Sequence, residues 1–160
     1  MQEADLDRFA LSDRPLDAVV IASLSSELAS SHAGALVTFE GRVRDTNGGR
    51  IVRGLEYDAY SAMCMREGQA VVEEALKVPG VLDARCVHRV GGLAIGDVAV
   101  WVGVIAGHRD EAFRACRYVI DEVKRRVPIW KKERYADGSS GWIGLDDMAA
   151  GLDPGRRPAS

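Results

Sequence analysis

The chain has 160 residues, of which 47% are hydrophobic and 28% are charged, and its formal net charge is −3. This length suits one domain with one core, and this composition excludes a disordered or fibrous protein. No apolar run approaches the roughly 20 residues that cross a bilayer, and the acidic first residues lack the basic and apolar regions of a signal peptide. We therefore expect a cytoplasmic protein with no membrane segment.

The predicted elements begin with a helix of about ten residues that starts near Pro15, a residue that is favoured at the first helical position. Residues 35–44 alternate between apolar and polar side chains, which predicts a strand on which Arg42 and Arg44 project together. A turn signal at residues 47–49 and an extended pattern over 51–60 follow. We therefore expect these two segments to form a hairpin.

The second half of the chain repeats this mixture of helices and strands. A helix is predicted over 61–77, a strand over 81–90, and an apolar strand over 98–105 that is covered on both faces. The next helix, at about 110–126, is expected to bury its apolar side chains at spacings of three and four, namely Phe113, Cys116, Ile120 and Val123.

A short strand over 129–133 is the last predicted element, and on it Lys131 and Glu133 point one way while Trp130 and Lys132 point the other. The order α-β-β-α-β-β-α-β indicates an α+β fold in a single domain, with mixed antiparallel strands and three main helices. We expect the domain to span 15–143, between a flexible N-terminus (1–14) and a flexible C-terminal tail (144–160).

Positive charge gathers in residues 108–134, which hold nine bases and five acids. His108 and Arg109 precede a helix, where free N–H groups favour an anion, and a guanidinium can bind phosphate through two hydrogen bonds. Lys124 and Lys131 are separated by a helix end and a proline, so they can converge. In such a pair, crowding lowers the pKa of one lysine while the other stabilises developing negative charge.

Other chemistries have little support in the sequence. No phosphate-binding loop, zinc-protease motif or esterase motif is present, and Cys64, Cys86 and Cys116 are too far apart for a common zinc-binding pattern. We expect buried thiols and neither a metal nor a cofactor. Charge alone leaves open that the basic residues form a solvated surface and that a lysine of this pair merely packs over Trp130. His32 and His88 are interpreted as structural.

Five segments that occur in order resemble the family of the large, catalytic subunit of molybdopterin synthase. They are GALVTFEGRVR (34–44), LEYDAY followed by Met63, HRVGGLAIGD (88–97), GHRDEAFRAC (107–116), and IDEVKRRVPIWKKE with a later DG (120–138). The resemblance covers about residues 15–143. It implies an α/β hammerhead-like fold and sulfurtransferase activity in molybdenum cofactor biosynthesis.

The resemblance also implies the partners and the reaction. The chain would form a homodimer, and a small ubiquitin-like sulfur-carrier subunit would bind at each outer end, which gives a heterotetramer. The carrier's C-terminal Gly-Gly thiocarboxylate would enter a pocket and transfer two sulfurs to cyclic pyranopterin monophosphate, forming the molybdopterin dithiolene. No nucleic acid or membrane would take part.

Site residues follow from the same resemblance, position by position. Lys124 and Lys131 would be catalytic, with Lys124 as the acid/base or acyl-contacting residue and Lys131 as the stabiliser of an anionic intermediate. Phe39 would pack beneath the site. The substrate-binding residues would be Arg42, Val43, Arg44, His108, Arg109, Lys124, Lys131, Lys132 and Glu133. His108 and Arg109 would reach the pocket from the other subunit of the dimer.

Two other functions remain open at this point. One is a non-catalytic dimeric module that binds a phosphate or pterin, which would need charge but not the Lys124–Lys131 pair. The other is an RNA-binding domain that uses the basic residues of 108–134, but exposed aromatic residues are not interleaved with those bases.

Overall fold

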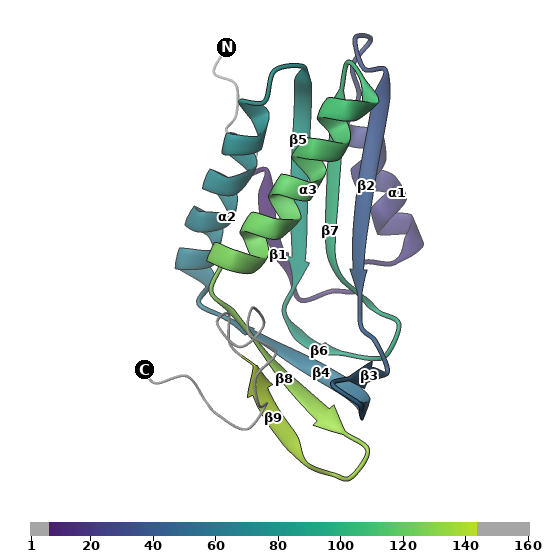
Figure 1. The fold of residues 1–160 in the computed structure, drawn as a ribbon, viewed down its shortest axis with the longest axis vertical. Coiled ribbons are helices and arrows are strands. Elements are labelled where there is room, and N and C mark those ends of the chain that lie inside the picture. Colours follow the sequence, from purple (N-terminus) through teal and green to yellow (C-terminus); the bar gives the residue numbers. More distant parts are fainter. Residues whose placement is uncertain (1–6, 144–160) are drawn as a thin grey trace.

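The computed structural model describes residues 7–143, which form two sheets and three helices (Figure 1). The larger sheet has the strand order β1-β5-β7-β2. Its strands are β1 (Phe9–Ser12), β2 (Ala35–Arg42), β5 (Val81–Arg89) and β7 (Val98–Ala106). β1 runs parallel to β5, and the other neighbours are antiparallel. The predicted α+β domain with mixed strands and three helices is thereby confirmed.

The smaller sheet lies at the lower end of the molecule in Figure 1. Its order is β3-β4-β8-β9, and β6 also pairs with β4. These strands are β3 (Thr46–Asn47), β4 (Arg50–Ala59), β6 (Gly91–Leu93), β8 (Ile129–Tyr135) and β9 (Ser140–Ile143). This sheet draws its strands from both halves of the sequence, so residues far apart in the chain become neighbours in space.

The three helices cover the two faces of the larger sheet. In Figure 1, α2 (Ser61–Leu76) and α3 (Arg109–Arg126) lie in front of the sheet and α1 (Ala18–Glu27) lies behind it. All nine residues of β7 are buried, which confirms the predicted strand that is covered on both faces. None of the helices within residues 7–143 is long and apolar enough to cross a membrane.

The predicted hairpin between residues 35–44 and 51–60 is wrong. β2 pairs with β7 along its whole length, whereas β4 belongs to the other sheet and pairs with β8. Within residues 35–60 only 46–51 form a hairpin, between β3 and β4, and Gly48 and Gly49 make its turn with φ angles of 56° and 78°. Alternation identifies a strand but not its partner, so proximity in sequence was misleading here.

The expected flexible N-terminus over 1–14 is wrong for residues 9–12. These residues form β1 beside β5, and Phe9 is fully buried against the core under α2. The apolar side chain of Phe9 and four residues of strand pairing fix this segment to the sheet. Residues 1–6 and the predicted tail 144–160 lie outside the described residues.

The predicted apolar stripe of α3 is confirmed for Cys116, Ile120 and Val123 but is wrong for Phe113. The buried residues are Ala112, Ala115, Cys116, Val119, Ile120 and Val123. Phe113, which was expected to be buried, is 60% exposed. Small alanines face the sheet instead, so the backbone of α3 can lie close to β7 and β2.

Candidate active site

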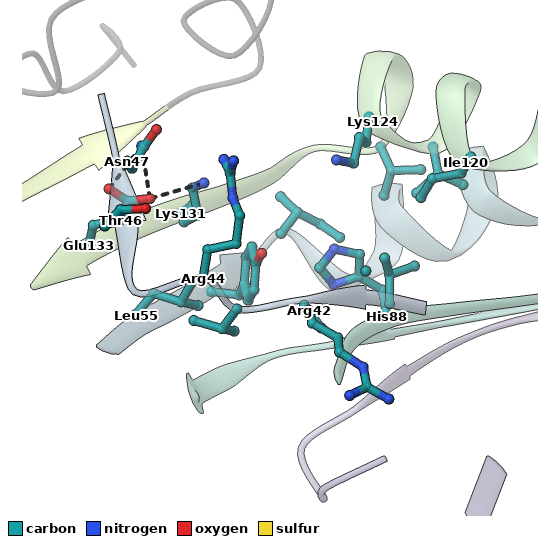
Figure 2. A pocket seen from close by; sticks show the side chains of 18 residues that line it. Arg42, Arg44, Thr46, Asn47, Leu55, His88, Ile120, Lys124, Lys131 and Glu133 are labelled. Atoms are coloured by element: carbon teal, nitrogen blue, oxygen red, sulfur yellow. Dashed lines mark hydrogen bonds and ion pairs between the residues drawn. The ribbon is translucent and has the colours of Figure 1, made fainter. Parts of the chain in front are cut away.

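A pocket of about 180 Å³ opens where the two sheets meet the C-terminal half of α3 (Figure 2). Strand ends from both sheets form its floor and walls, and the last turns of α3 form one side. Arg44, Lys124 and Lys131 line it, while Glu133 is the only carboxylate among its described lining residues. The pocket therefore has a positive lining that suits a small anionic ligand.

The chain path brings Lys124 and Lys131 to the same pocket. Lys124 lies in the last turn of α3, which ends at Val127 in extended conformation, and β8 starts at Ile129. The chain thus reverses within a few residues, and both amines face the cavity in Figure 2. The alternation on β8 also places Lys131 and Glu133 on one side, as the sequence predicts.

Lys124 has a lowered pKa, although part of its side chain is exposed at the pocket mouth. Desolvation of the amine is the largest cause, and the positive charges of Lys131 and Arg44 add to it. Within residues 7–143 no carboxylate lies within ion-pair distance of Lys124. A lysine in these surroundings can release its proton more readily than an ordinary lysine.

Lys131 has different surroundings, because a buried carboxylate holds it. Its Nζ lies 3.1 Å from Oε1 of Glu133, and the Glu133 side chain is only 4% exposed. Both carboxylate oxygens of Glu133 also accept hydrogen bonds from Nδ2 of Asn47 at 3.0 Å. Lys131 is therefore a fixed cation at the pocket wall.

The floor of the pocket contains two neutral polar rings, those of His88 and Tyr57. Burial lowers the pKa of His88 to about 4 and raises that of Tyr57 to about 12. Nδ1 of His88 lies 2.6 Å from the carbonyl oxygen of Arg89, and since a carbonyl only accepts, Nδ1 carries the proton. The rings meet edge to face, with centroids 4.9 Å apart.

The sequence interpretation missed this floor. His88 was assigned a structural role, and Tyr57, Thr46 and Asn47 were not singled out, yet all four line the pocket. A single buried histidine at the end of a strand has no distinctive spacing. Only its position in the segment HRVGGLAIGD could have drawn attention to it.

Arg42 and Arg44 do not project together, contrary to the sequence prediction. The register of β2 against β7 shifts between Gly41 and Arg42, and the strand ends there. Both residues line the pocket, but only the guanidinium of Arg44 points toward the two lysines. The guanidinium of Arg42 points the other way, and its Nη2 lies 2.6 Å from Oε2 of Glu40 (Figure 2). The shift breaks the two-residue period that the prediction relied on.

Two apolar residues predicted for the site lie at or near the pocket. Val43, between the two arginines, is buried and lines the wall. Phe39 packs against the core cluster that contains Ile120 and Val123, and both of those residues line the pocket. Phe39 thus supports the pocket from behind.

Three predicted site residues lie away from the pocket of their own chain. His108 and Arg109 are at the N-terminal end of α3, about 22 Å from Lys124 at 1.5 Å of rise per residue. Lys132 is on the opposite side of β8 from Lys131, and its Nζ lies 5.5 Å from the ring centroid of Trp142. The structure of one chain therefore unites Arg44, Lys124, Lys131 and Glu133 but not these three.

The charges and polar groups of the site can hold an anion and transfer protons. Within residues 7–143 no three His, Cys, Asp or Glu side chains are close enough to bind one. A partly desolvated lysine, a fixed cationic lysine and an arginine face a small cavity with a neutral floor. This arrangement defines the class of protein: a small α+β enzyme for an anionic substrate.

Comparison with known proteins identifies the family within that class. Residues 11–126 match the family described as MoaE protein. The molybdopterin synthase catalytic subunit of Synechococcus elongatus is 47% identical over 111 residues, which are 69% of this chain and 67% of the relative. That of Bacillus subtilis is 36% identical over 154 residues, or 96% of this chain and 94% of the relative.

A solved structure agrees with these sequence matches. The crystal structure of molybdopterin synthase from Staphylococcus aureus has a TM-score of 0.78 and 35% identity, and the match covers 87% of this chain and 98% of that one. The chain belongs to the MoaE family, and the resemblance found in the sequence is confirmed.

Proposed function

We propose that this chain is the catalytic subunit of a molybdopterin synthase and transfers two sulfur atoms from a thiocarboxylated carrier protein to cyclic pyranopterin monophosphate. The observation that carries this proposal is the meeting of Lys124, Lys131 and Arg44 in one pocket of a MoaE-family chain. A binding module would need the charge of the pocket, but it would not need a lysine whose pKa is lowered.

The cysteines support delivery of sulfur by a partner. Cys64, Cys86 and Cys116 are free and buried, and none of them lines the pocket. Burial raises the pKa of Cys64 and that of Cys116 to about 11, so these thiols stay protonated and are poor nucleophiles at neutral pH. The sulfur therefore has to enter the pocket on another molecule, as a carrier thiocarboxylate would bring it.

The two lysines suggest a division of work in each transfer. In each transfer a carbon–sulfur bond forms on the pterin as an oxygen substituent leaves that carbon. The bond from the sulfur to the carrier's terminal acyl carbon breaks, and this acyl carbon takes up water to become a carboxylate. Lys131, fixed by Glu133, would stabilise the anionic intermediate. Lys124 would take and return the proton, because its pKa is lowered and no carboxylate of residues 7–143 pairs with it.

We also propose that the working assembly is a homodimer with one carrier subunit at each outer end. His108 and Arg109 lie too far from Lys124 to act in the same pocket of one chain. A second protomer could bring them to the phosphate of the substrate, where a guanidinium binds well. Three buried free thiols agree with a location in the reducing cytoplasm.

The test is a reconstitution from purified components. The chain is mixed with thiocarboxylated carrier and cyclic pyranopterin monophosphate, and molybdopterin is detected by the fluorescence of its oxidised derivative. We expect product with the natural chain and none when the carrier ends in an ordinary carboxylate. Tight binding of carrier and pterin without product would contradict the proposal and favour the binding module.

A further inference from the structure

Glu133, the carboxylate that holds Lys131, is itself held by a side chain from another strand. Nδ2 of Asn47 lies 3.0 Å from Oε1 and 3.0 Å from Oε2 of Glu133, and Nζ of Lys131 lies 3.1 Å from Oε1. Figure 2 shows the three groups in contact at one end of the pocket. Asn47 thus reaches Lys131 through one shared carboxylate.

Glu133 depends on these two partners because it is almost fully enclosed. A buried carboxylate is costly unless a cation and hydrogen-bond donors surround it. Lys131 supplies the cation, and Asn47 supplies an amide group that bridges both oxygens. Only the amide nitrogen of Asn47 can face a carboxylate, since the amide oxygen would repel it. The bridge fixes the plane of the carboxylate and so the place where the ammonium of Lys131 sits.

The local fold presents Asn47 to Glu133 across 86 positions of sequence. Asn47 ends β3 and pairs with Arg50, across a turn whose two glycines adopt positive φ angles. The guanidinium of Arg50 in turn lies 3.6 Å from the ring centroid of Tyr135 and contacts Asp137, which ties the hairpin to β8 and the residues that follow it. The hairpin is therefore anchored on the strand that carries Lys131 and Glu133.

We propose that Asn47 is a positioning residue for sulfur transfer: through Glu133 it holds the ammonium of Lys131 at the pocket wall. The inference rests on the proposed function and adds to it a residue outside the lysine pair. Asn47 needs no contact with the substrate in this role. Its loss would leave the pocket charge unchanged but would release the cation that the reaction needs in one place.

The test uses two variants of nearly the same size. Asn47→Leu removes the donor and adds no charge, so kcat should fall roughly tenfold or more at every pH because Lys131 is no longer held in place. Asn47→Asp puts a second carboxylate beside Glu133, and two carboxylates in contact cannot both ionise easily. At low pH the pair shares a proton and regains a hydrogen bond. The ratio of the kcat of Asn47→Asp to the kcat of the natural chain should therefore fall from pH 6 to pH 9.

Other groups near Glu133 do not produce this trend. Lys131 is present in all of the proteins compared. The added carboxylate of Asn47→Asp would raise the pKa of Lys124, and this effect alone would make the ratio rise from pH 6 to pH 9 and not fall. Burial and the charge of Glu133 raise the pKa of Tyr57 and that of Tyr135 to about 12. Both phenols thus stay neutral between pH 6 and pH 9.

A double variant and a control complete the design. The double variant Asn47→Asp with Glu133→Gln has one amide and one carboxylate at these two positions, as the natural chain does. The ratio of its kcat to the kcat of the natural chain should therefore not change with pH. Ile51→Ser changes a 54% exposed residue of the same hairpin and should keep the kcat and thermal midpoint of the natural chain. A ratio for Asn47→Asp that does not change with pH, or full activity of Asn47→Leu, would overturn the inference. Absence of product with the natural chain would refute the proposed function instead.

Discussion

Lys124 and Lys131 have the same chemical group, but their neighbours separate their properties. Lys131 touches a buried carboxylate, whereas Lys124 faces two other cations and packed apolar residues. Desolvation and like charges favour the neutral form of the Lys124 amine, whereas Glu133 fixes the position of the Lys131 ammonium. The roles proposed for the two lysines rest on this difference in their surroundings.

Lys124→Ala tests the proton-transfer role directly. Removal of a general acid–base group lowers turnover by about 10²–10⁴-fold, and we expect a loss in that range in the reconstituted assay. Carrier binding should persist, because the fold and the rest of the pocket are unchanged. Lys77→Ala, at the end of α2 and outside the pocket, is the control. Normal turnover of Lys124→Ala would show that the mechanism is wrong even though the family is right.

Arg44→Met tests how the pocket tunes Lys124. The positive charge of Arg44 is one of the causes that lower the pKa of Lys124, so its removal should raise that pKa. A lysine that acts as a neutral amine gains activity as pH rises through its pKa. The ascending limb of kcat/KM against pH should therefore move to higher pH in Arg44→Met and stay in place in Arg66→Met, on α2. Movement to lower pH would contradict this account.

At the scale of elements, strand β1 and helix α2 depend on each other. Phe9 of β1 is fully buried, and its ring lies over Gly68 of α2, where an added Cβ would come within 2.3 Å of ring carbons. Glycine in the middle of a helix normally weakens it. Here the missing side chain makes room for the phenylalanine that fixes the N-terminal strand.

Gly68→Ala should therefore destabilise the protein, although the same change stabilises most helices. We expect the free energy of unfolding to fall by about 1–3 kcal/mol, the usual cost of overpacking a core, in a denaturant titration. The loss should shrink in a Phe9→Leu background, where the smaller side chain leaves space. A stabilising effect of Gly68→Ala in the natural chain would contradict this account, because the buried ring of Phe9 would then have to move aside freely.

Glu74 links α2 to α3, and its contribution to stability should depend on pH. It accepts hydrogen bonds from Arg126 at 2.7 Å and from Tyr118 at 2.6 Å, and these bonds lower its pKa from an ordinary 4.5 to about 2. When the pKa of a carboxyl is lower in the folded protein than in the unfolded chain, the group stabilises the folded protein at pH values above its pKa in the unfolded chain. This stabilisation is lost as the pH falls through the pKa of the group in the folded protein. The group is partly exposed, so we expect Glu74→Gln to cost only about 1 kcal/mol at pH 7.

The measurement is chemical unfolding of both proteins at pH 7 and at pH 3. The difference in the free energy of unfolding between Glu74→Gln and the natural chain should be smaller at pH 3 than at pH 7. At pH 3 the solution lies between the pKa of Glu74 in the folded protein and its pKa in the unfolded chain. Glu56→Gln, on β4, serves as the control. An equal difference at both pH values would show that the two hydrogen bonds do not stabilise the folded state.

Local sequence patterns predicted the long elements well and the pairing of strands poorly. Alternation and helical spacing located β2, β4, β5, β7, α2 and α3 within a few residues. They missed β1, β3, β6 and β9, because strands of two to four residues are too short to show a period. The partner of β4 is β8, 70 or more residues away in sequence, and no local pattern encodes that choice.

The sequence predicted the parts of the candidate site that depend on the local path of the main chain. It did not predict the parts that depend on contacts between distant segments. A helix end, a proline and a strand suffice to bring Lys124 and Lys131 together. The opposite directions of Arg42 and Arg44 depend on a register shift, and Asn47 meets Glu133 only because two strands of the smaller sheet are neighbours. Such contacts between distant segments become visible only in the folded chain.

At the scale of the whole molecule, α3 connects two surfaces that would have to cooperate. Its C-terminal end carries Lys124 at the pocket, and its N-terminal end presents His108 and Arg109 about 22 Å away. The exposed Phe113 lies close to that N-terminal end. If a second copy of the chain covers this end, one helix serves two pockets: its own through Lys124 and its neighbour's through Arg109.

Mixing two inactive variants tests this arrangement. Lys124→Ala and Arg109→Ala are combined by co-expression, so half of the dimers contain one chain of each kind. If a pocket uses Lys124 from one protomer and Arg109 from the other, each mixed dimer has one doubly changed pocket and one intact pocket, and about one quarter of the natural activity returns. Lys124→Ala mixed with Lys131→Ala should recover nothing, because both lysines belong to the same protomer's pocket. If the first mixture also stayed inactive while each variant still dimerised, Arg109 would not act across the dimer.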